Sequence, residues 1–426
     1  MFGGCARLVY RPLPTLRDIS AMKILIDGQT LLTPEINRGI GIYFKNCLEN
    51  ILENDFTNDF YINTANREHL KVLSPWARQK LCVIENEAYD IRATHQSGRE
   101  YVAERYSNTL HNDLETRAIH LYWSPNALMD NVFLPARQTG TCQFAVTIFD
   151  LIVLVMAKEY AKHLSASAMA SYKKKLNLLE RDYDLFLHIS RHTENDFRRM
   201  LHVEEKQHAV TLLAADSSFR PFPFPRVAAL SDYVIYTGGF DPRKNMDRAV
   251  EAFAKLQKKY KHDRKISTTQ FWIVCGLDKV AESRMLRRAE RLGLRGRVRF
   301  TGFIDDDALL ALYQKARCLF FPSLYEGFGL PILEGLACGL PVASSNTSSL
   351  PEVGGELVTY FDPYNIDEMA DSLYQAMRAP MDYQSRLKRY EYSKRFSWQE
   401  TARATLNAFV DCVSDVQRQR MAKRAN

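Results

Sequence analysis

Two segments of the 426-residue chain combine glycines with charged side chains in an order that could bind an anion. The first, GGFDPRKN at 238–245, follows the apolar run YVIYT, which we expect to be a strand. Gly238 and Gly239 would let the backbone approach a ligand, and Arg243 and Lys244 would add cations at the start of the next helix, whose free N–H groups and dipole favour an anion. Taken alone, such a segment is also ordinary turn chemistry. It matches neither the Walker loop nor the dinucleotide-binding G-x-G-x-x-G.

The second segment, SLYEGFGLPILEGLACGLPV at 323–342, holds two glutamates eight residues apart. Glu326 follows the apolar run CLFFPS, and Glu334 lies about a turn into a helix that we expect after Gly329. The backbone amides at 328–330 would be unpaired donors at the start of that helix. Ionised carboxylates are strong acceptors, so the pair could bind the hydroxyls of a sugar. Either glutamate alone would be read as a cap or a surface residue, but the ordered set favours a binding site.

Short apolar strands alternate with helices of ten to fifteen residues in both halves of the chain, which predicts parallel sheets made of βαβ units. The alternation is broken at SSFRPFPFPRVAALSD, where three prolines favour an interdomain linker. Ligands of such sheets bind beyond the carboxyl ends of the strands, and here two sets of ends could face one another across a cleft. The predicted divisions are an N-terminal extension at 1–21, an acceptor-side domain at 22–225, a donor-binding domain at 226–397, and a C-terminal helix with a basic tail at 398–426.

The motif EGFGLPILE, together with GGFDPRKN upstream, resembles the retaining glycosyltransferases of family four. MKILIDG, RGIGIY, VTIFDL, ISRHTENDF, TGFIDDDALLALY, SSNTSSLPEVGGE and YFDP extend the resemblance from Met22 to Trp398. It implies an α/β, GT-B fold: two facing Rossmann-like, doubly wound parallel-sheet domains with a C-terminal helix crossing back. YTGGFDPRKN and SNTSSLPEV are most similar to bacterial mannosyltransferases that build O-antigen and capsular polysaccharides.

The resemblance also implies roles for individual residues. Lys244 and Arg243 would hold the donor diphosphate, Glu334 would accept from the ribose hydroxyls, and Glu326 would lie beside the transferred sugar. Further candidates, by the same resemblance, are Gly39, Gly41 and Gly239 at the phosphates, Phe328, Gly329 and Leu330 at sugar and phosphate, Phe303 and Ile304 at the base, Asp150 with Phe149 on the acceptor side, and Ser190 facing the cleft.

Two positions depart from the family pattern. Many relatives have His where this chain has Phe149, which puts side-chain catalysis there in doubt, and many have Arg where it has Gly239, which leaves Arg243 to supply the second positive charge. Two rival functions remain open: a nucleotide-sugar isomerase or epimerase of the same fold, and a non-catalytic glycosyltransferase-like partner.

The resemblance implies retaining transfer of a hexose, mannose by subgroup, from a nucleotide-diphosphate sugar to a hydroxyl of a growing lipid-linked bacterial oligosaccharide. GDP-mannose is the expected donor and UDP-sugars are the alternative. No metal site and no cofactor beyond the donor are expected, and the acidic run 305–307 is interpreted as the cap of the following helix.

The composition is that of an ordinary globular protein, with 46% hydrophobic and 25% charged residues. Lys plus Arg and Asp plus Glu are 26 each up to residue 225, and 31 against 24 after it, which does not favour a nucleic-acid-binding protein. The eight cysteines show no C-x-x-C pair, which is typical of reduced cytoplasmic thiols. The longest apolar run, 142–157, is too short to span a bilayer. We expect lysines 173–175 on or beside an exposed helix face, where they and the basic tail could give weak peripheral contact with the inner face of the membrane.

Overall fold

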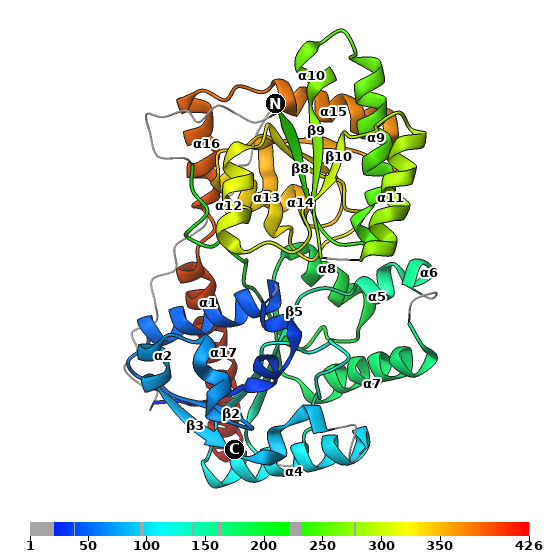
Figure 1. Cartoon of the computed structure of the whole chain (residues 1–426). Helices are drawn as coiled ribbons and strands as arrows, with labels where there is room; N and C mark the ends of the chain where they lie inside the picture. Colours follow the sequence, from blue (N-terminus) through cyan, green and yellow to red (C-terminus); the bar gives the residue numbers. More distant parts are fainter. Residues whose placement is uncertain are drawn as a thin grey trace.

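The computed structural model describes residues 21–37, 39–93, 98–138, 140–160, 164–221, 232–276 and 278–425, which form two α/β domains, one above the other in Figure 1. The fold class expected from the sequence is confirmed by these two parallel-sheet domains. The boundary predicted at 225/226 and almost all of the predicted extension 1–21 lie outside the described residues.

The first domain is built on a seven-stranded parallel sheet in the order β3-β2-β1-β4-β5-β6-β7. Its strands are β1 (Lys23–Asp27), β2 (Asp59–Thr64), β3 (Leu81–Glu85), β4 (Leu121–Ser124), β5 (Gln143–Ile148), β6 (Leu185–His188) and β7 (Gln207–Val210). The apolar runs of the sequence predict the first six. The sequence does not single out β7, because its four residues are only partly buried and lack a continuous apolar run.

Helices cover both faces of this sheet, and the strand residues alternate between them. Ile24 and Ile26 pack with α1 (Gly39–Asn54), whereas Leu25 packs in the cluster formed with α4 (Arg99–Thr116) and α7 (Ala166–Asp182). The other elements of the domain are α2 (Pro75–Lys80), α5 (Ile152–Val155), α6 (Ala157–Tyr160), α8 (Arg191–Met200), and the 3-10 turns η1 (Gly28–Leu32), η2 (Pro34–Asn37), η3 (Arg67–Val72), η4 (Glu87–Tyr89) and η5 (Ile91–Ala93).

Helix α7 forms as its apolar spacing predicts, and its three lysines differ in exposure. Lys173 and Lys174 are exposed, whereas Lys175 is buried, with 6% of its surface accessible. Lys175 lies three residues after the buried Tyr172, so it shares the core-facing side of the helix. The three lysines therefore do not form one exposed patch.

The second domain has a six-stranded parallel sheet in the order β10-β9-β8-β11-β12-β13. Its strands are β8 (Tyr233–Thr237), β9 (Gln270–Val274), β10 (Val298–Phe300), β11 (Cys318–Phe321), β12 (Val342–Ser345) and β13 (Val358–Phe361). Its helices are α9 (Met246–Lys259), α10 (Arg264–Thr268), α11 (Lys279–Arg291), α12 (Asp306–Lys315), α13 (Leu330–Ala337), α14 (Leu350–Gly354), α15 (Ile366–Arg378) and α16 (Tyr383–Ser393), with 3-10 turns η6 (Pro242–Lys244) and η7 (Gly355–Leu357). Asp305 caps α12 by accepting the amide N–H of Ala308 at 2.8 Å, as the acidic run predicts.

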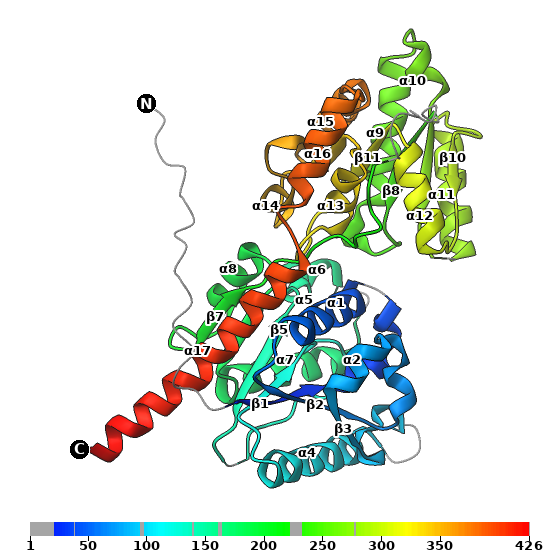
Figure 2. The same cartoon turned by 90° about the vertical axis from the view of Figure 1, so that its left-hand side faces the viewer.

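The C-terminal helix α17 (Trp398–Ala425) leaves the second domain and packs along the first (Figure 2). Its Phe409 ring lies 5.5 Å from the ring of Trp123, which belongs to β4. The Thr405 hydroxyl lies 3.8 Å from the Cys47 sulfur of α1. The helix that the sequence expects to cross back is therefore part of the core of the first domain. Among the described residues, no helix combines the length and the apolar character needed to cross a membrane.

Candidate functional site

The loop after β8 carries two cations and is fixed by its own turn. Asp241 caps η6, its carboxylate accepting the amide N–H of Arg243 at 3.0 Å. Asn245 then adopts a left-handed conformation with φ 58°, and its side-chain amide donates to two proline carbonyls of neighbouring loops, each at 3.0 Å. The sequence predicts these two cations at the start of the next helix. Helix α9 begins only at Met246, so they lie instead in the turn before it.

Glu326 lies in the loop after β11 and binds both cations. Its two carboxylate oxygens accept from Arg243 Nη1 at 2.5 Å and from Lys244 Nζ at 2.6 Å. Glu326 is 8% exposed, and 82 or 83 positions separate it from its two partners. The fold thus brings the charged residues of the two sequence motifs into one buried cluster.

The two cations hold Glu326 ionised, although burial lowers the pKa of Lys244 itself. Burial alone raises the pKa of the Glu326 carboxyl, but the adjacent Arg243 and Lys244 outweigh it and lower this pKa to about 2. Burial raises the pKa of Asp150, although Arg243 opposes that shift. Asp150 therefore belongs to the same electrostatic cluster and brings the first domain into it.

Gly327 is where the backbones of the two domains meet. A Cβ at this position would lie 2.0 Å from the carbonyl oxygen of Phe149, so no larger residue fits without a shift. The hydroxyls of Ser190 and Thr193 donate to the Gly327 carbonyl at 2.6 and 3.1 Å. Phe149 itself places its ring against Tyr43, with the centroids 5.3 Å apart. At the position where many family members have His, this chain therefore offers a backbone carbonyl and an apolar contact.

The start of α13 presents backbone donors beside Glu326. Gly329 precedes the helix with φ 109°, a conformation that favours glycine. Within the part of the chain that the structure describes, the amides of Phe328, Gly329 and Leu330 donate no hydrogen bond. These N–H groups and the helix dipole favour an anion at this end of α13.

Glu334 is half-buried in α13 and is held by a tyrosine that the sequence does not single out. The Tyr313 hydroxyl, which is fully buried, donates to Glu334 Oε2 at 3.0 Å and lies 3.2 Å from the Thr237 hydroxyl. Burial raises the pKa of Glu334 to about 7, and the hydrogen bond from Tyr313 opposes the shift. Glu334 therefore titrates near neutral pH. Tyr313 lies on the apolar side of a helix pattern, so the sequence offered no signal for this contact.

Glycines from the first domain lie at the same junction. A Cβ on Gly39 would lie 3.7 Å from the side chain of Leu330, which places the start of α1 opposite the start of α13. Gly41 has a different neighbour, since a Cβ there would lie 1.9 Å from the carbonyl oxygen of Ile36. Gly41 is therefore needed for the close packing of η2 against α1.

Three candidate residues, Phe303, Ile304 and Gly239, lie outside the Glu326 cluster. The Phe303 side chain is 82% exposed, and the neighbouring Ile304 is half-buried. No atom lies within 4 Å of a Cβ built on Gly239, so the space where many family members have Arg is open. The structure does not bring these three residues into contact with the Glu326 cluster.

Three further contacts between the domains involve residues that the sequence does not single out. The Tyr160 hydroxyl lies 2.8 Å from both carboxylate oxygens of Asp241. Tyr325 donates to the carboxylate of Asp196 in α8. The carboxylate of Glu352 accepts from the first two amides of α8, at 3.0 and 3.2 Å. The loops that carry the cations and Glu326 are therefore tied to the first domain on both sides.

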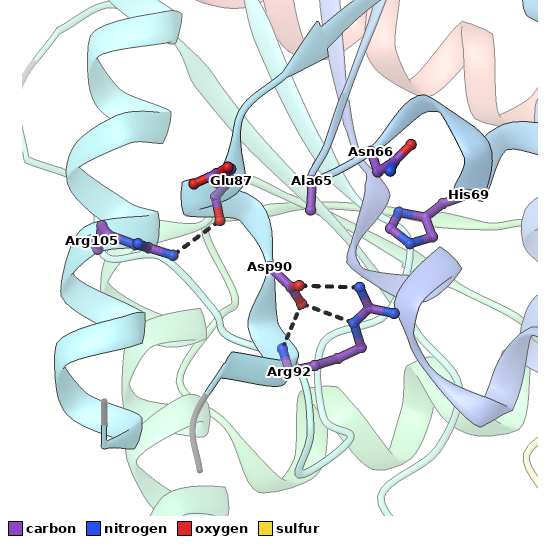
Figure 3. A pocket seen from close by; sticks show the side chains of 7 residues that line it. All are labelled: Ala65, Asn66, His69, Glu87, Asp90, Arg92 and Arg105. Atoms are coloured by element: carbon purple, nitrogen blue, oxygen red, sulfur yellow. Dashed lines mark hydrogen bonds and ion pairs between the residues drawn. The ribbon is translucent and has the colours of Figure 1, made fainter. Parts of the chain in front are cut away.

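A separate hollow of about 320 Å³ lies in the first domain, beyond the ends of β2 and β3 (Figure 3). Its arginines have partners, as Arg92 Nε binds the Asp90 carboxylate at 2.9 Å and Arg105 donates to the Glu87 carbonyl at 3.0 Å. It shares no residue with the Glu326 cluster.

Comparisons with known proteins agree with this architecture. Residues 227–395 match the family described as glycosyl transferases group 1. The O-antigen chain mannosyltransferase B of Escherichia coli is 27% identical over 352 residues, which cover 80% of this chain and 83% of the relative. The serotype-specific mannosyltransferase WbdA of Escherichia coli is 34% identical over 185 residues, but the match spans 42% of this chain and only 22% of that protein.

Solved structures share the two-domain fold over nearly the whole chain. WaaG, a glycosyltransferase involved in lipopolysaccharide biosynthesis, superposes with a TM-score of 0.60 at 15% identity and covers 92% of this chain and 99% of that one. Sucrose-phosphate synthase from Thermosynechococcus elongatus gives 0.61 at 19% identity, over 95% and 100% of the two chains. The family model thus identifies residues 227–395 as a group 1 glycosyl transferase domain, and the two parallel-sheet domains give the chain the GT-B fold.

Proposed function

We propose that the chain is a retaining mannosyltransferase that moves mannose from GDP-mannose to a hydroxyl of a growing lipid-linked oligosaccharide of the O-antigen type. The observation that carries the proposal is the buried cluster in which Arg243 and Lys244 bind Glu326 between the domains. The mannosyl donor and the O-antigen acceptor are supported by the relative that matches both domains.

The cluster and the free amides of 328–330 suit a leaving diphosphate. Cleavage of a sugar–phosphate bond develops negative charge on the phosphate oxygens, and fixed cations with preorganised N–H donors stabilise that charge. Arg243 and Lys244 are shared with Glu326, so phosphates binding here would compete with a carboxylate for the same two cations. We propose that these groups act without a metal ion or a further cofactor.

In the proposed chemistry no protein nucleophile takes part. The acceptor hydroxyl attacks the anomeric carbon on the face that the phosphate leaves, and the leaving phosphate takes the hydroxyl proton. Glu326 lies at the transferred sugar and Glu334 at the ribose, with Tyr313 holding the Glu334 carboxylate. The anomeric linkage of the product, measured by NMR, tests this step, since an inverted linkage would contradict it.

The donor is tested by thermal shift and by turnover. We expect GDP-mannose to raise the melting temperature more than UDP-sugars do, because a ligand that binds only the folded state stabilises it. Mannosyl transfer to a mannose-terminated acceptor should be lost in Lys244→Ala. Conversion of the donor in the absence of any acceptor would instead mark an isomerase, and binding without turnover over a panel of acceptors would mark a non-catalytic partner.

We also propose a cytoplasmic location with weak contact at the inner face of the membrane. Lys173 and Lys174 are exposed and could face anionic lipid, where each basic residue contributes about 1 kcal/mol. Co-sedimentation with anionic vesicles at low salt tests this contact, and its absence would exclude it.

A further inference from the structure

A larger pocket of the first domain lies between helices α4 and α7, with a volume of about 820 Å³. The segment 132–136, which follows β4, forms its inner wall. None of the residues of the Glu326 cluster lines it, so it is separate from the proposed donor site. What the pocket can bind therefore depends on the side chains that line it.

The pocket contains a buried lysine that pairs directly with no carboxylate in the described part of the chain, although the charge of Asp130 acts on it. Lys175 is 6% exposed, and its ammonium donates to the carbonyl of Met129. Among the described residues no carboxylate forms an ion pair with it. An ammonium has three N–H donors, and burying it beside a single neutral acceptor costs free energy. Burial, with the nearby Arg99, lowers the pKa of Lys175 to about 7.

Further cations line the same pocket. Lys174 is exposed at its edge and forms no ion pair with a described residue. The Arg99 side chain lies 3.4 Å from the carboxylate of Asp130 and over the ring of Phe133, at 5.6 Å. Arg181 pairs with a neighbouring aspartate at 2.8 Å. The two acidic residues of the lining, Glu100 and Glu104, are both exposed and lie on α4.

The inner wall of the pocket is apolar. It is made by Phe133, Leu134 and Pro135, and Leu178 adds a half-buried side chain from α7. The pocket thus combines a buried positive charge with an apolar wall and a more polar edge. A ligand complementary to it has an anionic group at one end and an apolar part at the other.

We propose that this pocket binds an anionic lipid, with its phosphate paired to Lys175 and its apolar chain against the wall formed by 133–135. The phosphate would supply the direct ion pair that the ammonium does not form with any described carboxylate. This inference does not depend on the proposed transfer reaction, because it uses no residue of the Glu326 cluster.

Isothermal titration with dihexanoyl phosphatidic acid tests the proposal on the full chain. We expect binding by the unmutated protein and at least tenfold weaker binding by Lys175→Met, which keeps the length of the side chain but removes its charge. Lys158→Met is the matched control, since it removes an exposed charge that does not line the pocket and should bind as the unmutated protein does. Lys175→Arg should retain more affinity than Lys175→Met.

Two lipid controls distinguish the sources of the anion. Dihexanoyl phosphatidylcholine, with the same chains and a zwitterionic head, should bind at least tenfold more weakly than phosphatidic acid. Inorganic phosphate should also bind at least tenfold more weakly than phosphatidic acid. Equal affinity for inorganic phosphate would overturn the lipid assignment, and so would failure of the unmutated protein to bind phosphatidic acid.

The stability of Lys175→Met gives an independent readout. If Lys175 is kept for a ligand, replacing its unpaired charge by an apolar side chain should raise the melting temperature of the free protein and abolish the shift caused by phosphatidic acid. A lower melting temperature combined with unchanged lipid binding would show that the lysine serves only as a donor to Met129, and would refute the proposal.

Discussion

Replacing Glu326 by Gln should destabilise the second domain, because it leaves two poorly solvated cations without their carboxylate. In the native structure the side chains of Glu326, Lys244 and Arg243 are only 10%, 14% and 20% exposed. Water can therefore compensate little for the lost charge. Removing one partner of a buried ion pair is costly because the remaining charge stays buried.

Two independent estimates of the free energy of unfolding lost in Glu326→Gln agree. The pKa of Glu326 falls from 4.5 to about 2 in the folded chain, and at about 1.4 kcal/mol for each pKa unit this corresponds to about 3 kcal/mol at neutral pH. Breaking a buried pair usually costs about 3–5 kcal/mol. Because the folded pKa is lower than the unfolded one, this stabilisation is fully present above pH 4.5 and is lost as the pH falls towards 2.

The assay is denaturant unfolding at pH 7 of the unmutated chain, Glu326→Gln, Lys244→Met and the double variant. Glu326→Gln should cost about 3 kcal/mol, and the double variant should cost less than the sum of the two single ones, because they share one interaction. The exposed Glu356→Gln serves as the matched control and should change stability little. A cost below about 1 kcal/mol for Glu326→Gln, or strict additivity, would refute the proposed electrostatic role of the cluster.

Three further changes test other contacts. Tyr313→Phe removes the hydroxyl that lies 3.0 Å from Glu334, so nucleotide affinity measured by calorimetry should fall by about fivefold to tenfold. The control is Phe219→Leu, which alters only the ring packed on Tyr313 and should leave the affinity nearly unchanged. Gly327→Ala places a methyl group on the Phe149 carbonyl, so transfer should be lost while circular dichroism is retained. Gly276→Ala, where the space is open, should keep full activity. His188 is fully buried, and burial holds its pKa well below the usual value. Below about pH 6.5 the unfolded chain therefore binds a proton that the folded chain does not, so stability should fall by about 1.4 kcal/mol per pH unit. The same slope in His188→Gln would contradict this assignment.

The architecture could be predicted because its strands are short apolar runs in regular alternation with helices. The runs YVIYT and FAVTIF become β8 and β5, each almost entirely buried. The same rule cannot find β13, whose middle residues Thr359 and Tyr360 are half-buried and do not form a continuous apolar run. The meeting of Glu326 with Lys244 follows from the rule that strand ends of a parallel sheet share one edge, but the ion pair itself could not be read from spacing.

Other features of the site depend on partners that the sequence does not reveal. The glycine at 327 is interpretable from sequence only as a flexible position, whereas the structure shows that the Phe149 carbonyl requires it. Lys175 looks like a surface residue by its charge, although its spacing from Tyr172 and Leu179 places it on the core side of α7. In both cases the deciding contact comes from a segment far away in the sequence.

The path of α17 reverses the usual order in which domains mature during protein synthesis. The core of the first domain includes Phe409, Cys412 and Val413, which the ribosome adds only after all the strands of the second domain. Domains generally fold as units in the order of their synthesis. Here the second domain can close its sheet while the first still lacks a helix of its core. A chain truncated before residue 398 would therefore carry a complete second domain attached to an incomplete first domain whose α1 face is uncovered.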